Sequence, residues 1–152
     1  MVSINEKMPV VLIAMTSDDD QTRYKEKLGG KVILLQAHTL KEARDLFAQN
    51  IKDISVIVVG SYLKKNQDDR PSKKLNTCDL VEDFCSKGFN DRIIAASDDK
   101  NICIRLIQSG CVYDSKMKAV PAVVLKQLRE LKKTHPNIPS SKTKIEQNKL
   151  VI

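Results

Sequence analysis

The chain of 152 residues contains no tryptophan, and aromatic residues make up only 4% of it. Its apolar runs are short: residues 9–15 and 54–59 fall far below the roughly 20 residues that a bilayer-spanning helix needs. We therefore expect no membrane anchor and no signal peptide, and a cytoplasmic protein. With 41% hydrophobic and 30% charged residues, the chain can bury a core of its own as one domain.

The cysteines lack the paired spacing of zinc sites, and no histidine lies close enough in the sequence to complete one. We expect them to be reduced thiols, as is usual in the cytoplasm. The two histidines, His38 and His135, have no nucleophile and carboxylate at the spacing of a catalytic triad. The sequence therefore indicates a protein that is not an enzyme. The four cysteines are Cys78, Cys85, Cys103 and Cys111.

The net charge of +7 is concentrated in two segments. Residues 64–74 carry five basic residues against two acidic ones, and residues 126–152 carry seven against two. Few aromatic residues lie among them, so stacking on bases is poorly supported and we do not expect a nucleic-acid partner. A solvated basic loop and a basic tail explain the charge.

Five apolar runs alternate with amphipathic stretches, which is typical of an α/β protein with a parallel sheet. Right-handed crossovers then place helices on both faces, and we expect the strand order 2-1-3-4-5. The folded domain covers residues 9–133, between an N-terminal extension at 1–8 and a flexible basic tail at 134–152. The five strands are expected at residues 10–15, 31–36, 54–59, 92–96 and 111–113.

Short polar side chains mark the helix starts, because they can accept hydrogen bonds from the free amides of a first turn. Asp18 or Asp19 is expected to cap the first helix, and Thr39 opens the second with a capping box. Asn76 or Thr77 is expected to cap the third helix. The run of residues 97–99 caps the fourth helix, and the last helix is expected at residues 120–132.

The carboxyl ends of the strands are where α/β proteins place their chemistry. In this chain the third strand runs directly into Gly60 and Ser61, so the first position after it has no side chain at all. Ser97 follows the fourth strand, and Lys116 follows the fifth. These residues should gather around one shallow pocket with residues 16–19, which follow the first strand.

In this arrangement the chain resembles a bacterial response-regulator receiver domain over residues 9–133. Receivers carry an acidic pair after the first strand, a phosphate-accepting Asp after the third, a Ser or Thr after the fourth and a Lys after the fifth. The matching places here hold residues 18–20 (or 15–16 without a gap), Gly60, Ser97, and Lys116 or Lys118. The resemblance implies a degenerate phosphorylation pocket made of Asp18, Asp19, Gly60, Ser61, Ser97 and Lys116.

The absent acceptor has a chemical consequence, because aspartyl phosphorylation needs a carboxylate nucleophile and a magnesium ion held by carboxylates. The resemblance therefore implies a non-phosphorylatable receiver, a protein-interaction module in two-component or phosphorelay signal transduction. A sensor kinase, another receiver or a second copy of the chain, as a homodimer, would dock on the region from Asp99 to Lys133. No cofactor is expected, although residues 18–20 could bind Mg²⁺ weakly.

Three other interpretations stay open. The chain could be a working receiver that uses Asp18, Asp19 or Asp53 as acceptor. It could be a small flavodoxin-like nucleotide or flavin binder, although no Gly-rich phosphate loop follows the first strand. It could also bind nucleic acid through its basic tail, with an affinity that falls steeply as salt rises.

Overall fold

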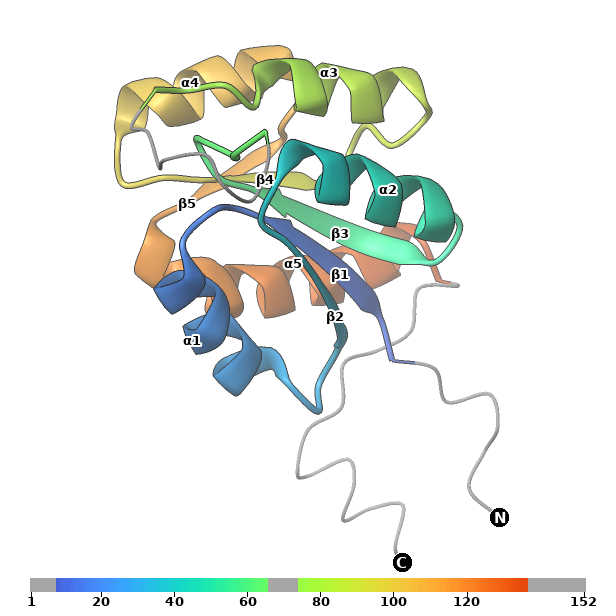
Figure 1. The fold of residues 1–152 in the computed structure, drawn as a ribbon. Helices are drawn as coiled ribbons and strands as arrows, with labels where there is room; N and C mark the ends of the chain where they lie inside the picture. The colour runs from blue at the N-terminus through green and yellow to red at the C-terminus, as the bar shows by residue number, and fades with distance from the viewer. Residues whose placement is uncertain (1–7, 66–73, 137–152) are drawn as a thin grey trace, which may run out of the picture.

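The fold is a five-stranded parallel sheet with helices on both faces, seen in a computed structural model that describes residues 8–65 and 74–136 (Figure 1). The strand order is β2-β1-β3-β4-β5, so the predicted receiver-like α/β fold is confirmed. The extension, the tail and the basic loop lie mostly outside the described residues. The elements are β1 (Val10–Ala14), α1 (Asp18–Leu28), β2 (Ile33–Ala37), α2 (Leu40–Asn50), β3 (Ile54–Val59), α3 (Cys78–Ser86), β4 (Ile93–Ala96), α4 (Lys100–Ser109), β5 (Tyr113–Ser115), the 3-10 turn η1 (Met117–Ala119) and α5 (Val120–Thr134).

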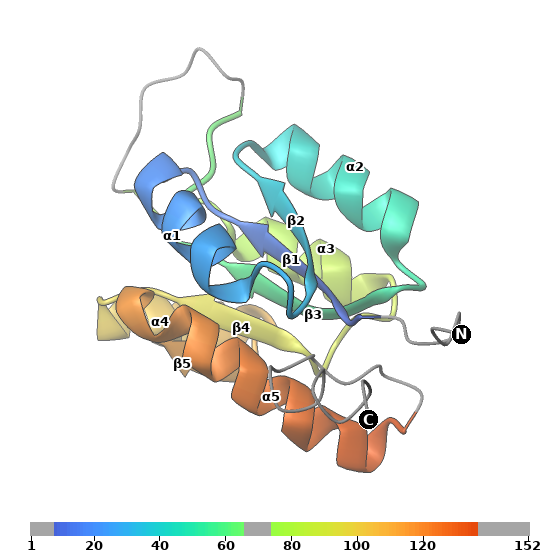
Figure 2. The same ribbon diagram turned by 90° about the horizontal axis from the view of Figure 1, so that it is seen from below.

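The sheet separates two hydrophobic clusters, because successive side chains of a strand point to opposite faces. In β1, Leu12 belongs to the cluster under α2, α3 and α4, whereas Val11 and Ile13 belong to the cluster under α1 and α5. Figures 1 and 2 show the same division, with α1 and α5 on one face of the sheet. β1 and β3 are buried along their whole length, as the continuous apolar runs predicted.

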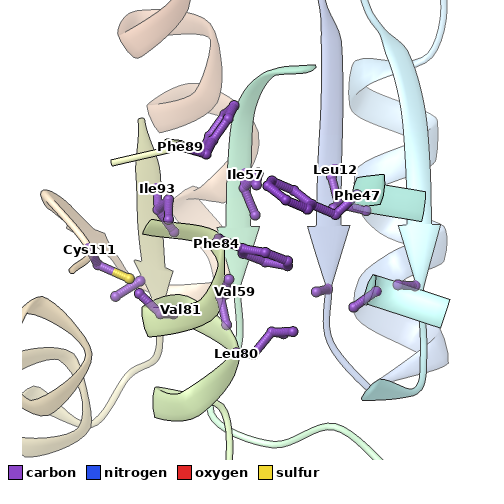
Figure 3. Close-up of a cluster of buried hydrophobic side chains, with 14 of the residues drawn as sticks. Leu12, Phe47, Ile57, Val59, Leu80, Val81, Phe84, Phe89, Ile93 and Cys111 are labelled. Carbon is purple, nitrogen blue, oxygen red and sulfur yellow. The ribbon is translucent and has the colours of Figure 1, made fainter. Parts of the chain in front are cut away.

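Three phenylalanines form the centre of the larger cluster (Figure 3). The Phe47 ring stacks on the Phe84 ring with centroids 4.3 Å apart, and it meets the Phe89 ring edge-on at 6.0 Å. These contacts join α2 to α3 and to the loop before β4, so the few aromatic residues of the chain are used mainly in the core.

The start of α1 differs from the expectation. Ser17 is the N-cap, and its hydroxyl accepts a hydrogen bond from the Asp20 amide at 3.2 Å. Asp18 and Asp19 lie inside the first turn, where their negative charge interacts favourably with the positive end of the helix dipole. For α2 the Thr39 cap is confirmed by the hydrogen bond from the Glu42 amide to the Thr39 hydroxyl, and the Glu42 carboxylate accepts from the His38 amide.

The fifth strand lies two residues later than predicted, at Tyr113–Ser115. Cys111 packs in the cluster under α3 and α4, and its amide donates to the Leu106 carbonyl at 3.0 Å, which continues the end of α4. The named strand begins at Tyr113, opposite Ile94, and the Val112 amide just before it donates to the Ile93 carbonyl of β4 at 3.0 Å. The apolar run at residues 111–113 therefore contains a helix end that periodicity does not distinguish from a strand.

Within the described residues, no helix is long and apolar enough to cross a membrane. The four cysteines are free thiols, with Cys103 and Cys111 buried and the other two partly buried. Cys78 and Cys85 lie in α3, Cys103 lies in α4, and Cys111 follows α4; these two helices pack against each other on one face of the sheet (Figure 1).

Candidate functional site

A cavity with a volume of about 490 Å³ opens at the carboxyl edge of the sheet. It lies where the strand order reverses between β1 and β3, the position at which open α/β sheets bind their ligands. Residues that follow β1, β3, β4 and β5 contribute to its wall. The lining residues are Met15, Thr16, Ser17, Asp18, Gly60, Ser61, Tyr62, Lys64, Ala96, Ser97 and Met117.

Four of the six predicted pocket residues line this cavity: Asp18, Gly60, Ser61 and Ser97. Asp19 and Lys116 are exposed and are not part of its wall. The structure therefore brings together four predicted residues and leaves two outside.

Met117 occupies the place near the cavity that the sequence analysis assigned to Lys116. Its amide donates to the Asp98 carboxylate at 2.9 Å, and its carbonyl accepts from the buried Tyr24 hydroxyl at 2.6 Å. Burial raises the pKa of the Tyr24 hydroxyl well above its ordinary value, and the nearby Asp20 carboxylate adds to the shift. The phenol therefore stays protonated as a donor and helps to fix the Met117 backbone at the cavity.

Gly60 marks a close approach between the ends of β1 and β3. Its amide donates to the Ala14 carbonyl at 2.9 Å. A Cβ atom on residue 60 would lie 2.9 Å from the Met15 Cβ atom, a separation that real Cβ atoms essentially never show. Any side chain at position 60, a carboxylate included, therefore requires one strand end to move.

Asp18 supplies the cavity's one carboxylate among the described residues. Its side chain is 90% exposed, and its Oδ1 atom lies 3.2 Å from His38 Nε2. The described residues contain no group of three or more His, Cys, Asp and Glu side chains that could hold a metal ion together.

Two residues expected to cap α3 hold the loop after β3 instead, and α3 has no side-chain cap. The Asn76 side chain accepts from the Leu63 amide at 2.9 Å and donates to the Leu63 carbonyl at 2.8 Å. The buried Thr77 hydroxyl donates to the Gly60 carbonyl at 2.6 Å. Asn76 and Thr77 therefore hold residues 60–63 of the loop from the segment directly before α3.

Thr16, which was expected at the pocket as the first residue after the first strand, connects three segments at the cavity. Its hydroxyl accepts from the Lys64 amide at 3.1 Å and lies within donating distance of the carbonyls of Tyr62 (3.3 Å) and His38 (3.4 Å). The Lys64 carbonyl in turn accepts from the Leu40 amide at 2.8 Å. The only sequence signal for Thr16 is its place directly after a buried strand.

Ser97 sits between the cavity and the start of α4. Its hydroxyl oxygen accepts from the Asp99 amide at 3.1 Å, and Asp99 is the residue that caps α4, through the amides of Asn101 and Ile102. The Ser97 hydroxyl proton has no acceptor among the described residues. The predicted capping run is thus confirmed in its last member, and Ser97 keeps a donor for the cavity.

Exposed apolar side chains are concentrated between α4 and β5. The described residues include four exposed large hydrophobic side chains, and three of them are Ile104 (52% exposed), Ile107 (42%) and Val112 (43%). Ile104 and Ile107 are three residues apart on α4, so they share one face of that helix. The fourth, Ile33, lies on the edge strand β2.

No protein-family model matches the chain, and no curated protein matches it. Solved structures do. The N-terminal domain of an uncharacterised protein from Wolinella succinogenes aligns with a TM-score of 0.65 and 15% identity, over 84% of this chain and 96% of that chain.

Receiver domains align to a similar extent. A response regulator receiver protein from Pseudoalteromonas atlantica has a TM-score of 0.62 and 14% identity, over 81% of this chain and 99% of that chain. The response regulator domain of Thermotoga maritima CheB has a TM-score of 0.60 and 15% identity, over 82% of this chain and 96% of that chain. At these identities the likeness concerns the fold, and the chain has the fold of response-regulator receiver domains.

Proposed function

We propose that this chain is a non-phosphorylatable receiver, a signalling module that acts by binding other proteins. The observation that carries the proposal is the close approach at Gly60. The place of the phosphate acceptor holds no side chain, and the 2.9 Å separation from Met15 Cβ leaves no room for one. Phosphoryl transfer to that position has no nucleophile.

The surroundings of Gly60 support the same conclusion. Met15 and Thr16 directly follow β1, so the acidic pair of a receiver is replaced there by a thioether and by a hydroxyl that hydrogen-bonds to backbone. Asp18 is displaced onto the first turn of α1 and faces solvent. Hard divalent cations prefer several carboxylate oxygens at one place, and a single exposed carboxylate provides a weak site.

The alternative acceptors are less well placed. Asp53 precedes β3 and Gly60 follows it, so Asp53 lies at the opposite end of the strand from the cavity. Asp19 is exposed outside the cavity wall. Asp18 is the remaining candidate, and its carboxylate is 90% exposed and lies 3.2 Å from His38 Nε2.

The proposed docking surface is residues 99–133. The exposed side chains of Ile104 and Ile107 on α4 supply apolar contact area. Exposed basic residues on α5, among them Lys126 and Arg129, would favour a partner with acidic groups. A sensor kinase, another receiver or a second copy of the chain would bind there, and no phosphoryl switch would be needed.

The test of the first part is the intact mass of the full chain after incubation with acetyl phosphate and Mg²⁺, beside a receiver that retains its acceptor Asp. We expect the control to gain one phosphoryl group and this chain to gain none. A stoichiometric adduct that is acid-stable and labile to hydroxylamine would contradict the proposal, and peptide mapping would then identify the acceptor. Gly60→Asp is a poor positive control, because the new side chain must displace Met15.

The test of the second part compares two exposed isoleucines. Ile104→Glu should weaken binding to sensor kinases or receivers encoded in the same genome, or to a second copy of the chain. Ile33→Glu, on the edge strand and similarly exposed, should leave binding unchanged. Equal effects of both substitutions would move the docking surface away from α4.

A further inference from the structure

We propose that the cavity at the carboxyl edge of the sheet binds a small organic anion. Lys64 and Ser61 would hold its charged group, and Met15, Ala96 and Met117 would contact its apolar body. This inference goes beyond the proposed function, because it concerns a ligand and does not require partner docking.

The cavity has the size and position of a ligand site. Its volume of about 490 Å³ falls in the range of roughly 300 to 1,000 Å³ that is usual for small-molecule pockets. Gly60 lines the cavity and adds no side chain to its wall.

The wall that would hold the anion is already formed. The Lys64 backbone is fixed by the Thr16 hydroxyl on its amide and by the Leu40 amide on its carbonyl. Asn76 holds both backbone groups of Leu63, directly before it. A preorganised wall keeps the entropy cost of binding low.

The charges around the cavity favour an anion. Lys64 is partly buried and has no ion-pair partner among the described residues. The carboxylate of Asp18 lies at the rim, 90% exposed and beside His38. The hydroxyls of Ser61 and Ser97 have no acceptor among the described residues. The cavity therefore offers one cation and two hydroxyl donors, which a carboxylate or phosphate group would use.

The opposite part of the wall is apolar. Met15 and Ala96 are buried under the cavity, at 2% and 1% exposure. Met117 is partly buried, and its backbone is held by Tyr24 and Asp98. Thioether side chains adapt to ligands of different outline, so an aromatic or aliphatic body can fit against them.

The experiment is a titration of the ¹⁵N-labelled full chain with 2-naphthoate, followed by the amide signals of Gly60, Ser61 and Ser97. We expect saturable shifts at these amides. Lys64→Met should weaken binding by about tenfold, because a charged hydrogen-bond partner is lost. Lys52→Met, an equal change of charge on an exposed residue at the other end of β3, should change the affinity by less than about twofold.

Two comparisons on the unaltered chain keep the test valid even if Lys64→Met does not fold. 2-Naphthalenemethanol has the ring without the charge, and acetate has the charge without the ring. Each should bind at least about tenfold more weakly than 2-naphthoate. No saturable shift with 2-naphthoate, or equal affinity for the neutral alcohol or for acetate, would overturn the proposal. The acetyl phosphate experiment has a separate readout, so the two proposals can fail independently.

Discussion

Gly60 cannot accept a phosphoryl group, and the structure indicates that the fold also needs a glycine at this position for its stability. We predict that Gly60→Ala destabilises the fold. The new Cβ atom would lie 2.9 Å from Met15 Cβ and 3.6 Å from the Ala14 carbonyl oxygen. Both neighbours belong to the backbone or to its first side-chain atom, so no rotamer change relieves the contact.

The magnitude follows from what must move. The ends of β1 and β3 are joined there by the hydrogen bond from the Gly60 amide to the Ala14 carbonyl. Met15 is 2% exposed and packs in the cluster under α1 and α5, so it has little room to retreat. Overpacking of a buried site usually costs about 1 to 3 kcal/mol. We expect the free energy of unfolding to fall by about that amount.

The assay is urea unfolding followed by far-UV circular dichroism, with the m-value compared to confirm the same two-state transition. Ser61→Ala is the matched control: its hydroxyl has no partner among the described residues, so the change should stay within about 0.5 kcal/mol. If Gly60→Ala were as stable as the control, the close approach would not constrain position 60, and an acceptor could be restored there by one substitution.

Three further predictions follow from other contacts. Gly110→Ala should lower the free energy of unfolding by about 2 to 5 kcal/mol, because residue 110 has φ +137° and its Cβ would overlap Cys85 Sγ. In urea unfolding, adding Cys85→Ala should recover only the part of this loss that is due to the steric overlap. Full recovery of the stability would contradict the argument from backbone strain. Asn76→Ala leaves the amide and carbonyl of Leu63 unpaired, so hydrogen exchange of the 60–64 loop should accelerate, whereas unchanged exchange would show that the loop is held by other contacts. Burial raises the pKa of the Cys111 thiol from 9.0 to about 12: the unfolded chain loses this proton first as pH rises above 9.0, so stability should fall there by at most about 1.4 kcal/mol per pH unit. Cys111→Ala should flatten that slope in urea unfolding at about pH 8 and about pH 10, and an unchanged slope would place the titrating group elsewhere.

The elements that the sequence predicted well are those with a strong local signal. β1 and β3 are buried on both faces, so their continuous apolar runs are readable without knowing their neighbours. The Thr39 cap depends on residues three apart in the chain, and it was predicted correctly. β5 was predicted two residues too early, because Cys111 and Val112 extend the apolar run without belonging to the strand. Cys111 packs in the core at the end of α4, and Val112 is exposed.

The pocket residues divide in the same way. Gly60, Ser61 and Ser97 follow the buried strands β3 and β4, so their place at the carboxyl edge was predictable once the strand order was inferred. Lys116 follows the misplaced strand, and it lies outside the cavity while Met117 lines it. Asn76 and Thr77 have the residue types of helix caps, but their hydrogen bonds go to a loop more than ten residues earlier.

The sequence by itself determined the alternation of strands and helices and the missing carboxylate at position 60, because both depend on local periodicity or on residue identity. Only the tertiary structure decided that position 60 is closed by Met15 Cβ, that Lys64 and Met117 line the cavity, and that Asn76 holds its wall. These facts depend on distances between segments far apart in the chain, and local sequence patterns do not specify such distances.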